Sequence, residues 1–255
     1  MYIKVPIIFV IIAVSNYSLA QSDLIFKAGF EKYQVQKLND TGITWAGEAP
    51  TGNVACNSTT FTYPQDCNAG RDATHNDNSD GRAGFSFTKL DASGVPLVDQ
   101  SVDYQTTPWA CVQDNVTGLI WEVKTDDGGI HDKDNAYKWG GLTALGREHI
   151  NRIGDYYDDW NSLVNGSNNE VLCGVSDWRV PVVSELSSII NRGSINPSID
   201  TNYFPNAVTK FFWAASPTAF YSGTNAWAVS FENGGDGNYS RDQFNVRVRL
   251  VYSGE

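Results

Sequence analysis

The chain contains four cysteines, and the way they pair constrains its fold more than any other feature of the sequence. Four cysteines in an exported protein indicate two disulfides, for which three connectivities exist. We predict that Cys56 pairs with Cys67 across a local loop and that Cys111 pairs with Cys173 over a long range. Catalytic thiols are the alternative, but no sequence feature places a polarising His or a helix N-terminus beside a cysteine. The sequence therefore favours a disulfide-stapled domain.

Export is predicted from the N-terminus. Lys4 precedes an apolar run, and the small residues of Ser18-Leu19-Ala20 have the spacing of a cleavage site, so residues 1–20 are predicted to be a secretory signal peptide. No later stretch is apolar enough to cross a bilayer. We expect a mature protein that is secreted, periplasmic or at the cell surface, without a transmembrane segment.

The charge of the mature chain limits its partners. Removing residues 1–20 deletes one Lys and no acid, which leaves 17 basic and 29 acidic residues and a net charge of −12. Such a surface argues against binding to nucleic acid or to anionic membranes, and it leaves carboxylates free for divalent cations. The full chain has 8 Trp, 12 Tyr and 12 Phe, of which only Tyr2, Phe9 and Tyr17 lie in residues 1–20, so the remaining 235 residues have enough aromatic side chains for a packed core.

Apolar spacing predicts short helices and several strands. Apolar residues recur at helical spacing after Pro181, and residues 155–164 carry an aromatic stripe with the same spacing that ends near Gly166. Alternation of apolar and polar residues predicts strands elsewhere. These strands lie at residues 85–88, 119–121, 211–215, 227–231 and 244–252. Turn-bounded strands combined with two helices indicate an α+β domain with an antiparallel sheet.

Oxygen-bearing side chains alternate in the loop before Gly81, at Asn76, Asn78 and Asp80. This spacing can wrap a loop around a hard cation, with the glycine supplying the sharp turn, and Asp72 adds a further oxygen. The loop lacks the terminal bidentate Glu of an EF-hand, and an Asx-rich turn without metal is the alternative. The predicted cofactor is a structural calcium ion, with no other cofactor.

A second acidic loop lies at residues 126–134, where four Asp residues surround His131. It is a second candidate for cation binding, but irregular acidic loops are usually just solvated. The chain has 3 His in all, so a His-rich transition-metal site is not expected.

The order of the motifs after residue 107 resembles the Lcl C-terminal domain family, which takes its name from a bacterial collagen-like adhesin. The resemblance extends over residues 107–253, more than half of the mature chain. Each motif alone is weak, and their order over this length carries the resemblance. The matching residues are Trp109, Cys111, the run 114–122, Cys173-Gly174, the run 177–181, Glu185-Leu186, the run 203–206, Phe212-Trp213, Trp227, Val229, Phe231 and the run 248–251.

The resemblance implies a fold related to C-type lectins and to formylglycine-generating enzymes, with short helices packed on a compact antiparallel sheet and with long loops. It also implies a bacterial exported protein, and the adhesin that names the family uses this domain to bind sulfated polysaccharides during attachment. Two departures limit that transfer. The chain has no collagen repeat, so trimerisation is not implied, and its acidic charge is unfavourable for sulfated glycans.

Three aromatic residues are candidates for stacking on sugar rings, namely Trp213, Tyr221 and Trp227. The alternation around Trp213 and Trp227 favours burial of both side chains in the core instead. The calcium-dependent sugar-binding motifs of true C-type lectins are absent from the sequence, so their binding mode is not carried over to this chain.

We therefore predict a non-enzymatic binding module with a loop-rich N-terminal extension, residues 21–106, and a C-terminal domain, residues 107–254. Its ligand would be a glycan or a surface protein, and its oligomeric state is not determined by the sequence. The alternative is a structural envelope protein that binds a protein partner. A formylglycine-type oxidase is disfavoured because no cysteine follows Cys173. An open pocket lined by aromatic and acidic residues would favour the binding module, whereas an extended exposed apolar patch would favour the structural protein.

Overall fold

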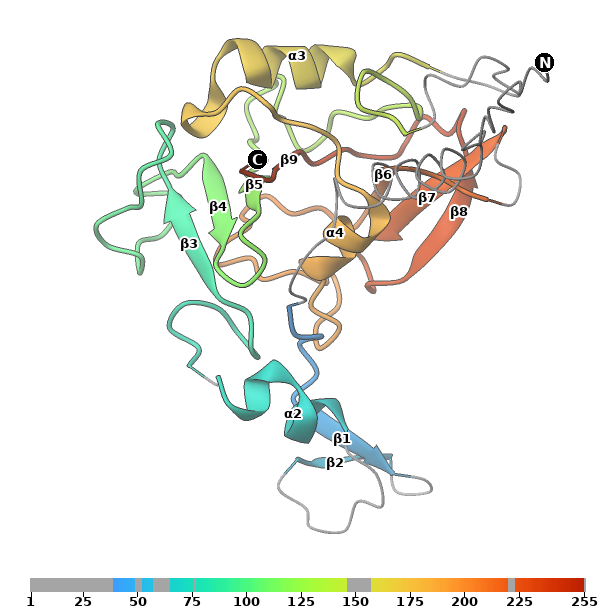
Figure 1. Cartoon of the computed structure of the whole chain (residues 1–255). Coiled ribbons are helices and arrows are strands. Elements are labelled where there is room, and N and C mark those ends of the chain that lie inside the picture. The colour runs from blue at the N-terminus through green and yellow to red at the C-terminus, as the bar shows by residue number, and fades with distance from the viewer. Residues whose placement is uncertain are drawn as a thin grey trace, which may run out of the picture. The chain divides into compact units, whose positions relative to one another are not determined.

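The computed structural model describes residues 39–48, 52–56, 65–75, 77–145, 157–219 and 223–254, all within one compact unit that spans Val35–Glu255. The predicted signal peptide, Asn76 and Tyr221 lie outside the described residues. The described part is α+β, as predicted, with short helices and small antiparallel sheets joined by long loops (Figure 1).

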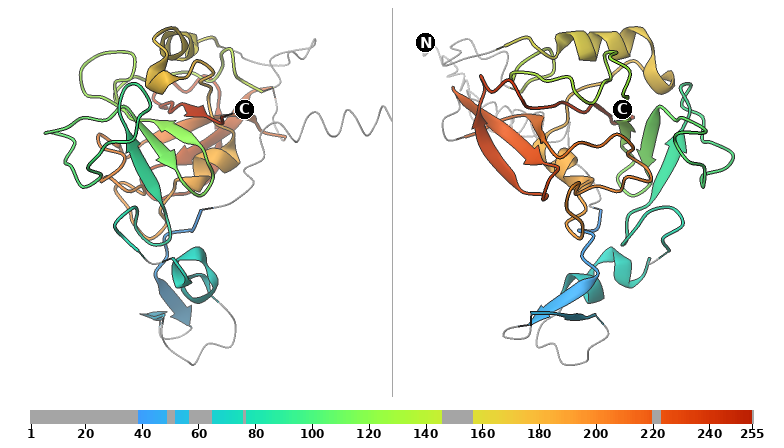
Figure 2. Two further views of the ribbon diagram at one scale, coloured as in Figure 1. Left: turned by 60° about the vertical axis from the view of Figure 1, so that its left-hand side comes forward. Right: turned by 180° about the vertical axis from the view of Figure 1, so that it is seen from behind.

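Antiparallel strands form three sheets in the described residues. The two larger sheets lie on opposite sides of the unit, as the views in Figure 2 show. The smallest sheet pairs β1 (Trp45–Glu48) with β2 (Gly52–Ala55). The four-stranded sheet has the order β3 (Phe87–Leu90), β4 (Cys111–Asp114), β5 (Ile120–Glu122) and β9 (Val251–Tyr252), and the three-stranded sheet has the order β6 (Phe211–Pro217), β7 (Asn225–Ser230) and β8 (Asp236–Ser240).

The described helices are α2 (Asp66–Ala69), α3 (Asn161–Asn169) and α4 (Val183–Ser188), with 3₁₀ turns η2 (Arg71–Ala73) and η3 (Leu172–Gly174). α3 starts later and runs further than the sequence predicted. The helix predicted at residues 155–164 was wrong in its bounds, because Gly166 lies inside α3 rather than ending it. A Cβ on Gly166 would lie 2.6 Å from Ile130 Cδ1, so the glycine lets the loop that carries Ile130 pack closely on the helix.

α4 begins shortly after Pro181, where the sequence predicted a helix start. Glu185 reaches back from the first turn, and its Oε2 accepts a hydrogen bond from the main-chain N–H of Val182 at 2.8 Å. Arg179 donates two hydrogen bonds to the same carboxylate, at 2.8 and 2.7 Å. This bidentate pair fixes the turn before the helix against its first turn.

Both predicted disulfides are confirmed. The Cys56–Cys67 bond closes a local loop with a sequence separation of 11, whereas the Cys111–Cys173 bond joins β4 to η3 across a separation of 62. Cys111 and Cys173 are both buried in the core. Because all four cysteines of the chain are in disulfides, none is available as a free thiol.

Buried aromatic side chains fill the core in two groups. The Cys111–Cys173 disulfide and α3 belong to the first group, and α4 packs in the second, against β6 and β7. The largest members of the first group are Trp139, Trp160, Trp178 and Trp213, and those of the second are Trp109 and Trp121, followed by aromatic residues such as Phe85, Phe204, Phe212 and Phe231. The core is therefore built mainly from aromatic rings, which the composition made available.

Candidate ligand-binding site

A cavity of about 560 Å³ opens between three segments of the chain, residues 78–89, 100–109 and 200–205. Its size is in the range of ligand-binding clefts. We call it the Trp109 pocket after one of the aromatic residues that line it. Two other surface pockets in the described part are smaller, at about 250 and 340 Å³.

Aromatic side chains form one wall of the Trp109 pocket. The Trp109 indole N–H donates a hydrogen bond to the Tyr203 carbonyl oxygen at 2.9 Å, and the Tyr104 ring meets the Trp109 ring edge-on with 4.9 Å between centroids. The Tyr203 hydroxyl donates to the Ser79 carbonyl oxygen at 3.1 Å. Burial and the nearby Asp200 raise the pKa of Tyr203 to about 12, so its hydroxyl stays protonated. The wall is thus held by contacts between all three segments.

Lys89 is a buried cation in the same pocket, with only 4% of its surface exposed. Its Nζ lies 4.3 Å from the centre of the Trp109 ring and 5.2 Å from that of Tyr203, and it donates a hydrogen bond to the Val102 carbonyl oxygen at 2.9 Å. Burial lowers the pKa of Lys89, although three acidic residues nearby act in the opposite direction. The aromatic faces and the carbonyl partly replace the water that the ammonium has lost.

Acidic and basic residues are balanced in the pocket lining, which contains Arg82, Lys89, Asp103 and Asp200. Asp200 accepts a hydrogen bond from the Asn202 main chain at 3.0 Å, and burial raises its pKa. The described pocket therefore combines aromatic rings with both hydrogen-bond donors and acceptors. A pocket lined by aromatic and acidic residues is the feature expected of a binding module.

The three aromatic residues predicted to stack on a ligand do not meet in this pocket. Trp213 is completely buried, and its indole N–H donates to the Tyr137 carbonyl oxygen at 2.8 Å. It exposes no ring face for a sugar, which corrects its assignment as a ligand contact. Trp227 is half-buried on β7 opposite Asn238 of β8, away from the pocket, and stays a prediction. Tyr221 lies outside the described residues.

Of the residues predicted to bind calcium, Asn78 and Asp80 accept hydrogen bonds from within the protein. Asn78 Oδ1 accepts a hydrogen bond from the Ala83 main chain at 3.2 Å, and Asp80 Oδ2 accepts one from the Ser86 hydroxyl. Asp72 is buried beside Asp40, whose carboxylate accepts a hydrogen bond from the Asp72 main chain. Within the described ranges, no three His, Cys, Asp or Glu side chains are arranged to hold a metal ion. Calcium at this loop stays a prediction.

An acidic cluster around Asp72 was not predicted from the sequence. Asp40 Oδ2 accepts a hydrogen bond from the Asp72 main chain at 2.8 Å, and Asp66 accepts one from the Thr41 hydroxyl. Burial raises the pKa of Asp66 and of Asp72, and the charge of Asp40 adds to both shifts. The cluster joins residues far apart in the sequence, so no local sequence motif predicts it.

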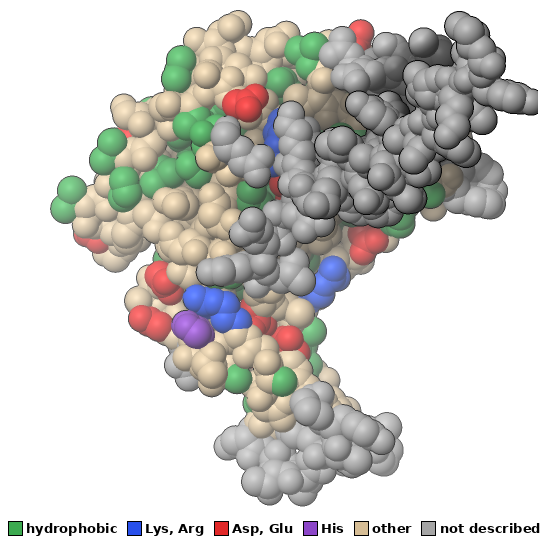
Figure 3. Space-filling model, in the orientation of Figure 1, with side chains coloured by type: hydrophobic (Ala, Val, Ile, Leu, Met, Phe, Trp, Pro, Cys, Tyr) green, Lys and Arg blue, Asp and Glu red, His purple; other side chains and the backbone are tan. Residues whose placement is uncertain are grey.

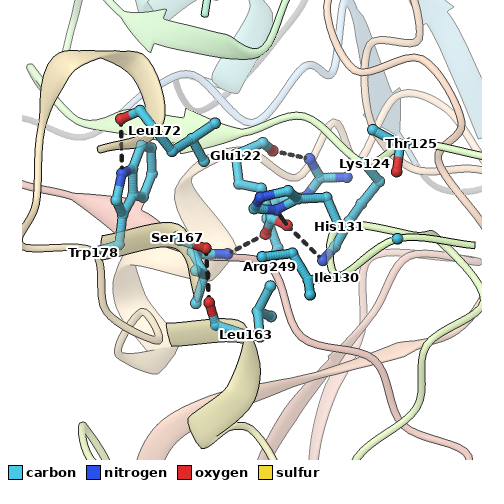
Figure 4. A network of polar contacts seen from close by, with 12 residues as sticks. Glu122, Lys124, Thr125, Ile130, His131, Leu163, Ser167, Leu172, Trp178 and Arg249 are labelled. Atoms are coloured by element: carbon cyan, nitrogen blue, oxygen red, sulfur yellow. Dashed lines mark hydrogen bonds and ion pairs between the residues drawn. The ribbon is translucent and has the colours of Figure 1, made fainter. Parts of the chain in front are cut away.

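A separate network of buried charges is centred on Glu122 (Figure 4). Its Oε1 lies 2.8 Å from Lys124 Nζ and 2.7 Å from His131 Nδ1, and its Oε2 accepts a hydrogen bond from the Leu250 main chain at 2.8 Å. The fully buried Arg249 donates to the Glu122 carbonyl oxygen. Burial alone would raise the pKa of Glu122, but the charges of Lys124 and His131 outweigh it and lower the pKa to about 2. The Glu122 and Lys124 side chains are shielded from solvent, with 0% and 3% of their surface exposed.

His131 connects this network to the end of α3. Its Nδ1 faces Glu122 and its Nε2 faces Glu170, the residue that follows the helix. A neutral imidazole carries one N–H, so only the doubly protonated ring can donate to both carboxylates. Burial opposes protonation, but hydrogen bonds to Glu122 and Glu170 raise the pKa of His131 above its usual value of 6.5. The loop that carries His131 is therefore held on α3 by a cationic bridge.

This bridge gives the stability of the protein a defined pH dependence. Because the pKa of His131 is raised in the folded state, its stabilising effect is complete below pH 6.5 and is lost as the pH rises through the raised pKa. We expect His131→Gln to lower the free energy of unfolding by about 2 kcal/mol at pH 6 and by less at alkaline pH. Urea unfolding of both proteins between pH 5.5 and 9 measures this difference. His75→Gln, at an exposed position, is the control, and an equal pH trend in both variants would contradict the assignment.

The site and the fold together define a disulfide-stapled α+β domain with a ligand-sized pocket between its loops, an architecture consistent with an extracellular protein. The chain belongs to the Lcl C-terminal domain family, whose model matches residues 110–252. No curated protein and no solved structure matched the chain, so its relation to the C-type lectin fold stays a prediction. None of the described helices is long and apolar enough to cross a membrane.

The pocket residues that were not predicted from the sequence lie on both sides of the point where the family match begins. The segment 200–205 lies inside the match, whereas residues 78–109 precede it. Residues 91–106 contain no regular pattern and belong to the predicted loop-rich N-terminal extension. One signal was available: Phe85, Phe87 and Lys89 alternate along one strand, which places a lysine on the buried face.

Proposed function

We propose that the protein is an exported, non-enzymatic binding module and that it binds a carbohydrate in the Trp109 pocket. The observation that carries this proposal is the composition of the pocket, in which aromatic rings lie beside acidic, amide and basic side chains. The two disulfides and the family are consistent with an extracellular location.

A carbohydrate fits this lining because each sugar hydroxyl both donates and accepts hydrogen bonds. Carboxylates such as Asp103 accept from hydroxyls, whereas the Lys89 ammonium and the Asn202 amide donate to them. The C–H face of a sugar ring packs well on an aromatic ring, and the half-buried Tyr104 has ring surface to offer. With two acidic and two basic residues, the lining suits a small polar ligand better than a hydrophobic one.

Binding without catalysis is supported by the residue types in the pocket. The described lining contains no His and no Cys, so it has no nucleophile–base pair of the Cys–His or Ser–His kind. A formylglycine-type oxidation needs reactive thiols, and all four cysteines are in disulfides.

The charge distribution also bears on the type of glycan. On the face shown in Figure 3, acidic and basic side chains are interspersed, and neither sign forms a continuous patch. Polymers with many sulfate groups bind best to broad basic surfaces. We therefore propose that recognition involves a few sugar residues in the pocket rather than a long electrostatic groove.

Tyr104→Ala should weaken binding to the preferred glycan by about tenfold, because the ring would no longer contact the sugar. A glycan-array screen of the mature, oxidised protein identifies the glycan, and isothermal titration calorimetry compares the variant with wild type. Phe244→Ala is the matched control, because Phe244 is 77% exposed and lies outside the pocket. Running the screen in calcium and again in chelator tests the predicted calcium ion. If no glycan binds in either buffer, the carbohydrate proposal fails and a protein partner becomes the leading hypothesis.

A further inference from the structure

We infer that the ligand of the Trp109 pocket carries a carboxylate and that Lys89 recognises it. This inference rests on the proposed function, because it names the class of carbohydrate that the pocket binds. The class is an acidic sugar such as a uronic acid, whose single negative charge lies close to its ring.

The first step is that Lys89 lacks a counter-ion of its own. Among the described residues, no carboxylate oxygen lies within 4.0 Å of its Nζ. An ammonium has three N–H donors, and the described structure accounts for one of them, the hydrogen bond to the Val102 carbonyl oxygen. A buried charge is normally paired, because losing water without gaining a partner is unfavourable. Lys89 is therefore prepared to accept a partner that the chain itself does not supply.

The second step is that none of the three nearby acidic residues pairs with Lys89, and each accepts a hydrogen bond within its own turn, as Asp200 does from the Asn202 main chain. Asp99 accepts hydrogen bonds from the main chain and the hydroxyl of Ser101, at 2.8 and 2.6 Å. Asp103 accepts one from the Gln105 main chain at 2.8 Å. Each of these carboxylates closes a turn in its own segment. Their negative charges make the electrostatic potential around Lys89 more negative, but none of them forms an ion pair with its ammonium group.

The third step is the geometry of the ammonium. The Trp109 and Tyr203 rings and the Val102 carbonyl hold Nζ from the protein side, and Lys89 contributes to the pocket lining. The remaining N–H groups are thus preorganised, and a ligand carboxylate would meet a donor that needs little reordering. A neutral hydroxyl could accept the same hydrogen bonds but would leave the ammonium without a counter-ion in direct contact.

Binding of matched sugar pairs tests this inference directly. D-Glucuronic, D-galacturonic and D-mannuronic acid would each be titrated into the mature protein alongside their methyl esters, which keep the ring and remove the charge. Titrations in 0.15 M NaCl limit the general repulsion by the acidic surface. At least one acid should bind about tenfold more tightly than its ester, as expected for a charge-assisted hydrogen bond.

The Lys89→Met variant connects the preference to this residue. It keeps most of the length of the side chain and removes the charge, so the acid and its ester should bind equally well. Lys210→Met, at an exposed position, should keep the wild-type preference. Equal binding of acid and ester to the wild-type protein would overturn the role of Lys89 and leave the carbohydrate proposal intact. If no sugar of the panel binds and the glycan array is also empty, both proposals fail. The wild-type comparison requires no variant, so it remains decisive even if Lys89→Met does not fold.

Discussion

Glu122→Gln is expected to lower the free energy of unfolding by about 3–5 kcal/mol at pH 7, because it leaves Lys124 as a buried charge without its partner. The Lys124 and Glu122 side chains are 3% and 0% exposed, so water cannot replace the lost carboxylate. Glutamine retains the shape of the side chain, which confines the change to its charge. Urea unfolding monitored by tryptophan fluorescence measures the effect.

Two comparisons separate this buried interaction from general sensitivity to mutation. Asp126→Asn removes an ion pair with Lys133 in which the Asp126 side chain is 61% exposed, and it should cost less than about 1 kcal/mol. The double variant Glu122→Gln/Lys124→Met should be more stable than Glu122→Gln alone by about 1–2 kcal/mol, because the unpaired charge is removed as well. A loss in Glu122→Gln no greater than that in Asp126→Asn would show that the network does not stabilise the fold.

Removal of the Cys111–Cys173 disulfide is the second change with a large expected effect. The bond closes a loop with a sequence separation of 62, and the loss of this constraint on the unfolded chain corresponds to about 4 kcal/mol. The variant Cys111→Ala/Cys173→Ala should therefore unfold at a clearly lower urea concentration than the wild-type protein. Burial of both sulfur atoms adds a cavity to this loss.

The local Cys56–Cys67 disulfide is the natural comparison, because its shorter loop predicts a smaller loss of about 3 kcal/mol. The Cys56→Ala/Cys67→Ala variant also leaves the aromatic core untouched, since neither residue belongs to it. A long-range variant as stable as the local one would mean that the unfolded chain is not restricted by the longer loop.

Local patterns in the sequence predicted the elements of the fold better than their ends. The local Cys56–Cys67 pairing, the helix after Pro181 and the α+β class follow from spacing over short distances in the sequence. Once Cys56 pairs with Cys67, the other two cysteines are left to pair with each other. The end of α3 did not follow, because Gly166 has a tertiary role: it makes room for Ile130. A glycine looks the same in sequence whether it ends a helix or admits a neighbour.

The candidate site was harder to predict because its parts are distant in the chain. The contact between Trp109 and Tyr203 spans 94 residues, and the contact between Glu122 and Leu250 spans 128. No periodicity encodes such contacts. By contrast, a place in the core was the favoured prediction for Trp213, and the structure buries it within a continuously buried run of β6, residues 212–215.

The residues that line the Trp109 pocket are encoded by two stretches of the gene, one inside the family match and one before it. The Cys111–Cys173 disulfide and the 200–205 wall are encoded within the part that the family model matches, whereas Lys89 and Tyr104 are encoded before it. Tyr104 packs against the core without being fully buried, so substitutions at this position can change the chemistry of the pocket with little effect on the core of the shared domain. In an evolving lineage, recognition and folding could then be selected separately, with one scaffold carrying successive specificities.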